Sequence, residues 1–359
     1  MLKWMLALVM VLAGGVRAGD LYESGGPRRE VKVLDAEWRD DARGRDVPVR
    51  MYVPKGEGRF PLIVFSHGLG ASREMYGYFG RHMAESGYLV IAPTHRGSDT
   101  EARRAWSKEH GMEGKDDEGQ RWLQAGISDP DNLRNRPGDI SFVIDMAGKA
   151  PELAGIVDLE RIGVAGHSFG AYTALAAGGM TIDLPDAKGV SLRDPRVKAV
   201  MPMSPQGSGT MGITRESWEG VAVPVFFLTG TNDYGNGGRA ASWRREGFTH
   251  VAGVDDYLFT IDGATHMTFG GPGARGTKDE DTSVRGRIRE KIRDRVRAKS
   301  AEKSGGVDPD IEAHSEMTLA YASAFFDAYV RGDEKAKKWL VDYVAEKPGG
   351  CEAEYKAGK

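Results

Sequence analysis

The amino-acid sequence predicts an α/β fold whose central sheet is mostly parallel. Short, uninterrupted apolar runs recur along the chain, as is typical of strands buried on both faces of a sheet. Segments with helical spacing separate several of these runs, and strands that alternate with helices favour a parallel sheet covered on both faces. The third observation is the pentapeptide Gly166-His167-Ser168-Phe169-Gly170, which lies between an apolar run and a run of small residues. This context predicts a strand, a sharp turn with a serine at its apex, and a helix.

Composition limits the class of protein. With 359 residues, a formal net charge of −3 and 40% hydrophobic residues, the chain is long enough for one large α/β domain or two smaller ones. The nearly balanced charge does not indicate nucleic-acid binding, so we expect no nucleic-acid partner. Internal repeats and long low-complexity linkers are absent from the sequence, and we therefore expect residues 19–359 to form a single domain.

The first 18 residues have the pattern of a secretory signal peptide. Lys3 supplies a positive charge, residues 5–13 form an apolar core, and Val16-Arg17-Ala18 resembles a cleavage site with small residues. The apolar run is short for a bilayer-spanning helix, which disfavours the alternative of an uncleaved membrane anchor. We expect cleavage after Ala18 and a secreted or periplasmic protein.

The predicted strands and helices alternate along most of the chain. Two antiparallel strands, 31–38 and 47–53, are predicted by alternating apolar and polar residues on either side of a turn. Apolar runs then predict strands over 61–66, 88–92, 162–165, 197–203, 223–228 and 257–261. Helices are predicted over 73–86, 139–147, Asp308-Pro309 to about Arg331, and 334–344.

Ser168 is the candidate nucleophile. A serine raised above the edge of a sheet needs a strained backbone, and the chain on either side of it folds back tightly. Gly166 and Gly170 have no side chains that would collide across this turn. The alternative is an ordinary glycine-rich turn between a strand and a helix.

His266 is the candidate base that removes the proton of Ser168, because histidine has a suitable pKa. In this kind of fold the chain order is serine, then acid, then histidine. His266 directly follows a predicted strand. The alternatives are less suitable, since His250 precedes that strand and His314 lies among charged residues of the long helix.

Asp233 is the candidate acid that orients the base. It follows a predicted strand through a short loop, which is where the acid is expected. Asp255 and Asp256 precede the next strand and would lie at its opposite end, and Asp262 is very close to the base in sequence. A turn-forming aspartate is the other interpretation of Asp233.

Backbone N–H groups are expected to stabilise the oxyanion of a tetrahedral intermediate. One is the N–H of Phe169, directly after the nucleophile. The second is expected from the loop His67-Gly68-Leu69-Gly70, and we assign it to Leu69. His67 is expected to bond the backbone of the same loop.

Several sequence motifs, including the pentapeptide of Ser168, resemble those of a known family. The chain resembles the secreted serine-esterase branch of the α/β-hydrolases, and is most similar in pattern to platelet-activating-factor acetylhydrolase-like and dienelactone-hydrolase-like proteins. The resemblance covers most of residues 45–345 and implies an α/β-hydrolase fold and carboxylic-ester hydrolysis without a cofactor. The motifs that carry it are FSHGLG (65–70), APTHRG (92–97), RPGDISFVID (136–145), GHSFG (166–170), GATH (263–266) and AFFDAYVRGD (324–333).

The sequence departs from these relatives in two respects. Platelet-activating-factor acetylhydrolases place the acid after the strand that follows the nucleophile helix, but here the segment 197–205 has no carboxylate, which assigns the acid to Asp233. Dienelactone hydrolases use a cysteine nucleophile, whereas this chain has Ser168. The resemblance therefore does not identify a single substrate. Small-molecule, lipid and polymeric esters all remain candidate substrates. A peptidase or amidase on the same fold, and a non-catalytic binding protein, are the alternatives.

Three aromatic residues are candidates for lining a substrate pocket, with core packing as an equal alternative. They are Tyr76, Tyr78 and Trp122. Arg96 and Arg136 are expected to form structural ion pairs rather than to bind a substrate carboxylate.

Residues 273–306 form an unusual basic insertion. Val284, Ile288, Ile292 and Val296 recur every four residues and are surrounded by arginines. This pattern predicts a basic helix with a narrow apolar stripe. It is either a surface helix or a lid or docking element that contacts an anionic lipid or polymer surface.

No metal or cofactor is expected. The acidic residues between 116 and 131 lack the spacing of a calcium loop and are expected to form a solvated loop. Cys351 is the only cysteine, and its polar surroundings in the sequence predict a solvated free thiol.

Overall fold

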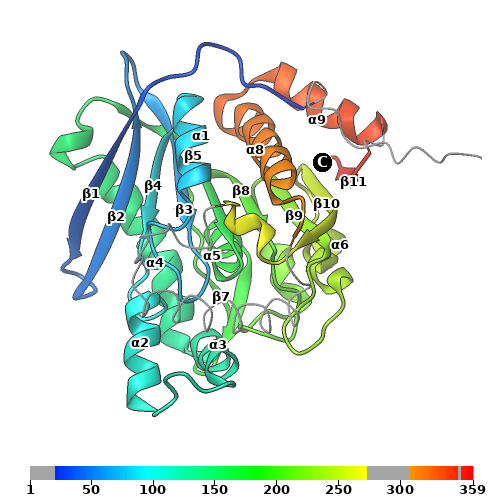
Figure 1. Ribbon diagram of the computed structural model, residues 1–359. Coiled ribbons are helices and arrows are strands. Elements are labelled where there is room, and N and C mark those ends of the chain that lie inside the picture. The colour runs from blue at the N-terminus through cyan, green and yellow to red at the C-terminus, as the bar shows by residue number, and fades with distance from the viewer. Residues whose placement is uncertain (1–20, 273–307, 347–348, 359) are drawn as a thin grey trace, which may run out of the picture.

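The computed structural model describes residues 21–272, 308–346 and 349–358. The predicted signal peptide and the basic insertion of 273–306 lie outside these residues, so both stay predictions. In the described part of the chain, a nine-stranded sheet has the strand order β1-β2-β4-β3-β5-β8-β9-β10-β11. Helices lie on both of its faces (Figure 1). The predicted α/β-hydrolase fold is confirmed.

Eight of the nine strands of the central sheet correspond to predicted strands, and β11 was not predicted. The nine strands are β1 (Val31–Asp40), β2 (Arg45–Pro54), β3 (Phe60–Ser66), β4 (Leu89–Pro93), β5 (Val157–His167), β8 (Val197–Met203), β9 (Val225–Asn232), β10 (Asp256–Thr265) and β11 (Cys351–Lys356). The six strands from β4 to β10 in the spatial order are parallel to their neighbours. The pairs β1–β2, β2–β4 and β10–β11 are antiparallel.

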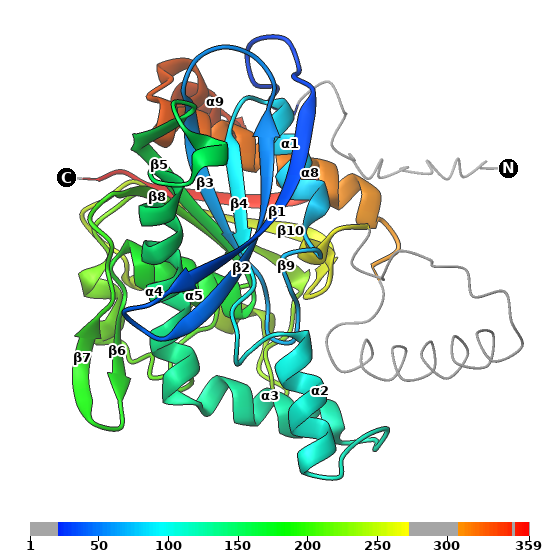
Figure 2. The same cartoon turned by 90° about the vertical axis from the view of Figure 1, so that its left-hand side faces the viewer.

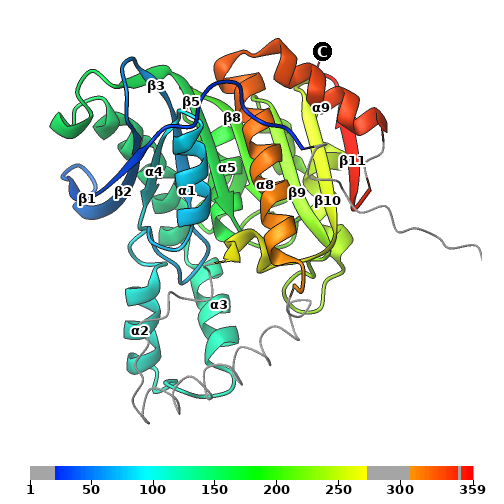
Figure 3. The same cartoon turned by 45° about the horizontal axis from the view of Figure 1, so that its top comes forward.

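Two layers of helices cover the sheet. Figure 3 shows α1 (Gly77–Glu85) and α8 (Ile311–Phe326) in front of the sheet, and α4 (Pro130–Ala147) and α5 (Phe169–Gly178) behind it. The core divides in the same way, because Ile140 and Leu175 belong to one buried cluster and Phe79 and Phe325 to the other. Every residue of β3 is buried, as expected for a strand with helices on both sides.

Other elements connect or flank these layers. A separate hairpin of β6 (Thr181–Leu184) and β7 (Ala187–Ser191) projects from the body (Figure 2). The C-terminal helices are the π-helical η7 (Asp327–Arg331) and α9 (Glu334–Glu346). The remaining short segments are η2 (Pro151–Leu153), η3 (Glu216–Gly220), η4 (Ala241–Arg245), α6 (Glu246–His250) and η5 (Thr268–Gly270).

Several helix predictions were wrong in extent. The helix expected to begin at residue 73 begins at Gly77, because 73–76 form turns. The helix expected over 139–147 begins at Pro130, where the Asp129 side chain accepts a hydrogen bond from the Asp131 N–H and caps it.

Two helices were not predicted at all. The segment expected to be an acidic loop forms α3 (Glu118–Ser128) and the start of α4, and α2 (Thr100–Glu109) precedes it. Both α2 and α3 lie at one end of the sheet (Figure 3). Only Ser107 of α2 and only Trp122 and Gly126 of α3 are buried, so both helices lie largely on the surface, and Leu123 and Ile127 of α3, one turn apart, line a cavity.

The predicted exposure of Cys351 is also wrong. Cys351 begins β11 and pairs with Ile261 of β10, and only 7% of its surface is exposed. Burial raises the pKa of its thiol to about 12. The prediction failed because the short segment 351–356 gains its strand structure from pairing with β10 and not from its own composition.

Among the helices of the described ranges, none combines the length and the apolar character that crossing a bilayer requires.

The Cys351 thiol should react with a disulfide reagent at least about a hundredfold more slowly in the native protein than in denaturant, because burial suppresses the reactive thiolate. Colorimetric titration of the thiol with and without denaturant measures this ratio. Rapid reaction of the native protein would contradict the burial of Cys351.

Candidate functional site

Ser168 forms the turn between β5 and α5. β5 ends at His167 and α5 begins at Phe169, and Ser168 has φ 58° and ψ −116°. L-residues rarely adopt such a positive φ. A Cβ atom on Gly166 would overlap the carbonyl group of Gly170, and a Cβ atom on Gly170 would overlap the Ser66 carbonyl oxygen. The turn therefore closes only with glycine at both positions.

The structure brings Ser168, His266 and Asp233 together in one line. Ser168 Oγ lies 3.0 Å from His266 Nε2, and His266 Nδ1 lies 3.0 Å from Asp233 Oδ1. The three residues follow β5, β10 and β9, whose carboxyl ends meet at one edge of the sheet. With the proton on Nδ1, the imidazole donates to Asp233 and accepts from the Ser168 hydroxyl.

The residues considered as alternatives make other contacts. His314 Nδ1 lies 2.8 Å from Asp308 Oδ2, and His250 lies 4.0 Å from Glu246. Asp262 accepts a hydrogen bond from the Thr231 hydroxyl at 3.1 Å.

Asp233 is fully buried and accepts hydrogen bonds on both carboxylate oxygens. Its Oδ2 accepts from the hydroxyls of Thr229, at 2.9 Å, and of Ser204. Ser204 directly follows β8, at the place where the family resemblance would put the acid. Burial opposes the ionisation of Asp233, but the Arg244 charge and the bonds from His266 and Ser204 hold its pKa far below the usual range.

Arg244 is a charged neighbour of this line that the sequence did not reveal. Only 2% of it is exposed, and its Nε lies 2.7 Å from Asp233 Oδ1. Its other N–H groups donate to the carbonyl oxygens of Ser204, Pro205 and Tyr234 at 3.0–3.1 Å. Burial and the Arg244 charge lower the pKa of His266, while Asp233 raises it, and the net shift is downward. Arg244 thus favours the neutral imidazole at rest.

The loop after β3 presents the Leu69 N–H to the same region. Gly68 O accepts from the Nδ1–H of His67 at 2.6 Å, and His67 Nε2 accepts from the His95 N–H at 3.0 Å. In a trans peptide the C=O and N–H point in opposite directions, so holding Gly68 O on one side turns the Leu69 N–H to the other. Within the described residues, neither the Leu69 N–H nor the Phe169 N–H has an acceptor.

Arg136 supports this region from inside the core. It donates to the hydroxyls of Ser98 at 2.8 Å and Thr173 at 3.0 Å and to the carbonyl oxygen of His67, and its guanidinium lies 4.3 Å from the Phe169 ring centre. Burial lowers its pKa to about 9. No described carboxylate lies within ion-pair distance, so the ion pair expected for Arg136 is wrong. The one expected for Arg96 is confirmed, with Asp99 at 3.2 Å.

Comparison with known proteins finds one family to which part of this chain is similar. A family described as "Platelet-activating factor acetylhydrolase, isoform II" matches residues 47–135. The platelet-activating factor acetylhydrolase of Canis lupus familiaris is 30% identical over 141 residues, which cover 33% of this chain and 32% of that protein. The protein of the same name from Cavia porcellus is 27% identical over 159 residues, which cover 36% and 34%. This chain has the α/β-hydrolase fold and is similar over part of its length to platelet-activating factor acetylhydrolases.

The similarity to these relatives covers only part of the chain. The chain spans about a third of the length of the curated relatives that it matches. The family match includes the loop of Leu69 and ends at residue 135, before Ser168. The support for the roles of Ser168, Asp233 and His266 in this α/β-hydrolase is therefore the geometry of the site.

Tyr76 does not line the site as a substrate contact but connects its loops. The Gly68 N–H donates to Tyr76 Oη at 3.2 Å, and the Tyr76 hydroxyl lies 3.0 Å from His167 Nδ1. His167 Nε2 lies 2.8 Å from the His266 carbonyl oxygen. Burial, together with the neighbouring His266, lowers the pKa of His167 to about 3, so its ring is neutral. With its proton on Nε2, His167 donates to His266 O and accepts from Tyr76.

Tyr78 and Trp122 also lie outside the pocket that contains Ser168. The Tyr78 hydroxyl donates to Phe269 O at 2.8 Å. Trp122 lines a separate depression between α2 and α3. All three aromatic residues assigned to substrate binding are thus placed elsewhere, because the pocket is built largely by segments, such as α3 and residues 206–212, that the sequence did not identify.

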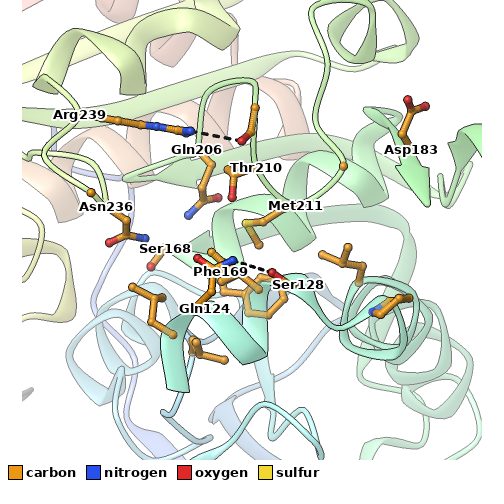
Figure 4. Close-up of a pocket in the computed structure, with 18 of the residues that line it drawn as sticks. Gln124, Ser128, Ser168, Phe169, Asp183, Gln206, Thr210, Met211, Asn236 and Arg239 are labelled. Carbon is orange, nitrogen blue, oxygen red and sulfur yellow. Dashed lines mark hydrogen bonds between the residues drawn. The ribbon is translucent and has the colours of Figure 1, made fainter. Parts of the chain in front are cut away.

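A cavity of about 810 Å³ opens beside Ser168. Leu69 and Phe169 also line it, together with residues of α3 and the loops after β8 and β9 (Figure 4). Its size is in the range of small-molecule binding sites. The candidate site therefore combines a serine–histidine–aspartate line, two unpaired backbone donors and a substrate-sized cavity.

Replacing Arg244 tests its effect on the base. Activity requires a neutral imidazole, so it rises as pH increases through the pKa of His266. Arg244→Met removes the charge that lowers this pKa, and the acid limb of the kcat/KM profile should move to higher pH. Arg244→Lys keeps a charge and should leave the limb near its wild-type position. Equal profiles for Arg244→Met and the wild type would contradict the assigned role.

Tyr76→Phe should lower kcat by about tenfold, because it removes the acceptor of the Gly68 N–H and so loosens Gly68, whose carbonyl shares a peptide with the Leu69 N–H. Complete loss of such a donor costs about 10²–10³. Tyr78→Phe is the matched control, since its hydroxyl bonds Phe269 O away from the cavity. Steady-state ester hydrolysis by both variants measures the difference. Equal kcat values for the two would show that the chain of bonds through Tyr76 is not needed.

Proposed function

We propose that this chain is a serine ester hydrolase that forms an acyl-enzyme at Ser168. The observation that carries the proposal is the line from Ser168 Oγ through His266 to Asp233, with 3.0 Å at each step. A serine hydroxyl is a weak nucleophile, and a base in hydrogen-bond contact activates it. The relatives are named platelet-activating factor acetylhydrolase, which supports ester hydrolysis.

In the first half of the reaction, Ser168 Oγ attacks the ester carbonyl carbon while its proton passes to His266 Nε2. The carbonyl oxygen becomes an oxyanion, and the N–H groups of Leu69 and Phe169 donate to it. When the intermediate collapses, the bond to the alcohol oxygen breaks and His266 returns the proton to that oxygen. The alcohol leaves, and the acyl group stays on Ser168.

In the second half, water takes the place of the alcohol. His266 accepts a proton from water, whose oxygen attacks the acyl carbon, and the collapse of this second intermediate releases the acid and restores the Ser168 hydroxyl. Asp233 stays ionised and stabilises the imidazolium in both halves. The chemistry uses only side chains and backbone groups of this chain, and water.

The cavity and the names of the relatives support carboxylic esters as the substrate class. The cavity beside Ser168 accommodates a short or medium acyl group, and the names of the relatives support an ester of a lipid. We propose carboxylic esters in which the alcohol part is small, lipid or polymeric. The N-terminal pattern supports an exported, secreted or periplasmic location.

Ser168→Ala should reduce the hydrolysis of a nitrophenyl-ester series by at least about 10³-fold, because no other group replaces the nucleophile. Ser191→Ala, at an exposed position of β7, is the control and should retain wild-type activity. A matched nitroanilide series distinguishes an esterase from an amidase. Binding of esters without turnover by the wild type would indicate a non-catalytic protein, and full activity of Ser168→Ala would refute the nucleophile.

A further inference from the structure

The cavity lies on one side of the proposed catalytic line. Ser168 and the two donors Leu69 and Phe169 line it, but His266 does not. Under the proposed function, the leaving alcohol takes its proton from His266 and therefore lies on the histidine side. The cavity then receives the acyl part of the ester.

The walls of this acyl cavity differ in character. Apolar side chains from α3, α4 and their surroundings form one wall, and they suit a carbon chain. They are Leu69, Leu123, Ile127, Leu133, Phe169 and Leu184. The other wall comes from the loops after β8 and β9 and carries polar side chains, including Gln206, Thr210, Asn236 and Arg239. Figure 4 shows these polar residues on the side of the cavity opposite Gln124.

Gln206 is a buried amide that lacks a partner. Only 6% of it is exposed, and its Oε1 makes no hydrogen bond within the described residues. Its side chain points into the cavity (Figure 4). Its Nε2 likewise makes no hydrogen bond within the described residues, and this amide N–H is the donor that an acceptor group of a ligand in the cavity can use.

Arg239 supplies a positive charge on the same wall. Its guanidinium lies 4.6 Å from the Trp243 ring centre, and its Nη2 donates to Gly209 O at 3.2 Å. These contacts hold the side chain in place. Within the described residues, Arg239 has no carboxylate partner, whereas the other two charges of the cavity, Asp183 and Lys188, pair with each other at 3.0 Å. The cavity therefore has one excess positive charge, and it lies near the unpaired amide.

We propose that Gln206 and Arg239 form a subsite for a carboxylate at the far end of the acyl group. The preferred substrates are then half-esters of short dicarboxylic acids, whose carbon chain lies along the apolar wall. Guanidinium and amide N–H groups are suitable donors for a carboxylate. This specificity depends on the proposed ester hydrolysis at Ser168.

The test compares charged and neutral acyl groups of equal chain length. Monoethyl succinate, glutarate and adipate are measured against ethyl butyrate, pentanoate and hexanoate by pH-stat titration. At least one monoester should have a kcat/KM about tenfold above its neutral counterpart, as expected for a charge-assisted contact. Absence of any such preference would overturn the subsite.

Substitutions of cavity residues test which side chains cause the preference for the charged monoester. Arg239→Gln should bring the ratio of kcat/KM for the monoester to kcat/KM for the neutral ester close to one by raising KM for the monoester. Arg239→Lys should restore part of the preference. Gln206→Glu is nearly isosteric and should disfavour the monoester through charge repulsion. Lys32→Gln removes an exposed charge of β1 outside the cavity and should leave the ratio unchanged.

The outcomes separate this proposal from the one on which it depends. A preference that persists in Arg239→Gln, or that Lys32→Gln abolishes equally, would overturn the subsite while leaving ester hydrolysis intact. Failure of the wild type to hydrolyse either series, or full activity of Ser168→Ala, would instead overturn the proposed function. Melting temperatures of the variants identify any loss of folding, and Arg239→Lys then tests the subsite without loss of the charge.

Discussion

The backbone conformation of Ser168 is the constraint on which the rest of the site depends. A positive φ at a non-glycine residue is unfavourable, and such strain persists only where the surroundings impose it. Here they do so, because the Ser168 N–H donates to Met203 O of the neighbouring strand at 2.9 Å and the glycines on either side allow close packing. The turn places Oγ against His266 and frees the Phe169 N–H to face the cavity.

Hydrogen bonds through His167 connect this turn to the two other loops of the site. From Gly68, the chain of bonds runs through the Tyr76 hydroxyl and the His167 ring to the backbone of His266. Because the His167 ring is buried and neutral, each nitrogen has one fixed role, either donor or acceptor. His167, the residue before the serine, thus fixes the base relative to the oxyanion loop.

Arg244 controls the charges of Asp233 and His266. Asp233 is buried with an arginine as well as a histidine, so the carboxylate stays ionised while the histidine stays neutral at rest. Arg244 also holds the carbonyl groups of Ser204, Pro205 and Tyr234 and so fixes the loops after β8 and β9. A single side chain therefore sets both the electrostatics of the proposed base and the shape of the polar wall near Gln206.

The sequence predicted those features that depend on local pattern. Continuous apolar runs identified the buried strands, and polar residues just beyond their ends identified Ser168, Asp233 and His266 as candidates. It did not reveal α2 and α3, which contribute few residues to the core, or β11, which becomes a strand through pairing with β10. Arg244 and Gln206 were missed because their importance comes from contacts between distant loops, which no local spacing encodes.

The most direct test of the account is the site of covalent labelling by a fluorophosphonate, located by mass spectrometry of the digested protein. The account predicts a single phosphonyl adduct, on the peptide that contains Ser168, and loss of ester turnover in proportion to labelling. An adduct on a different residue, or full turnover after complete labelling of Ser168, would contradict it.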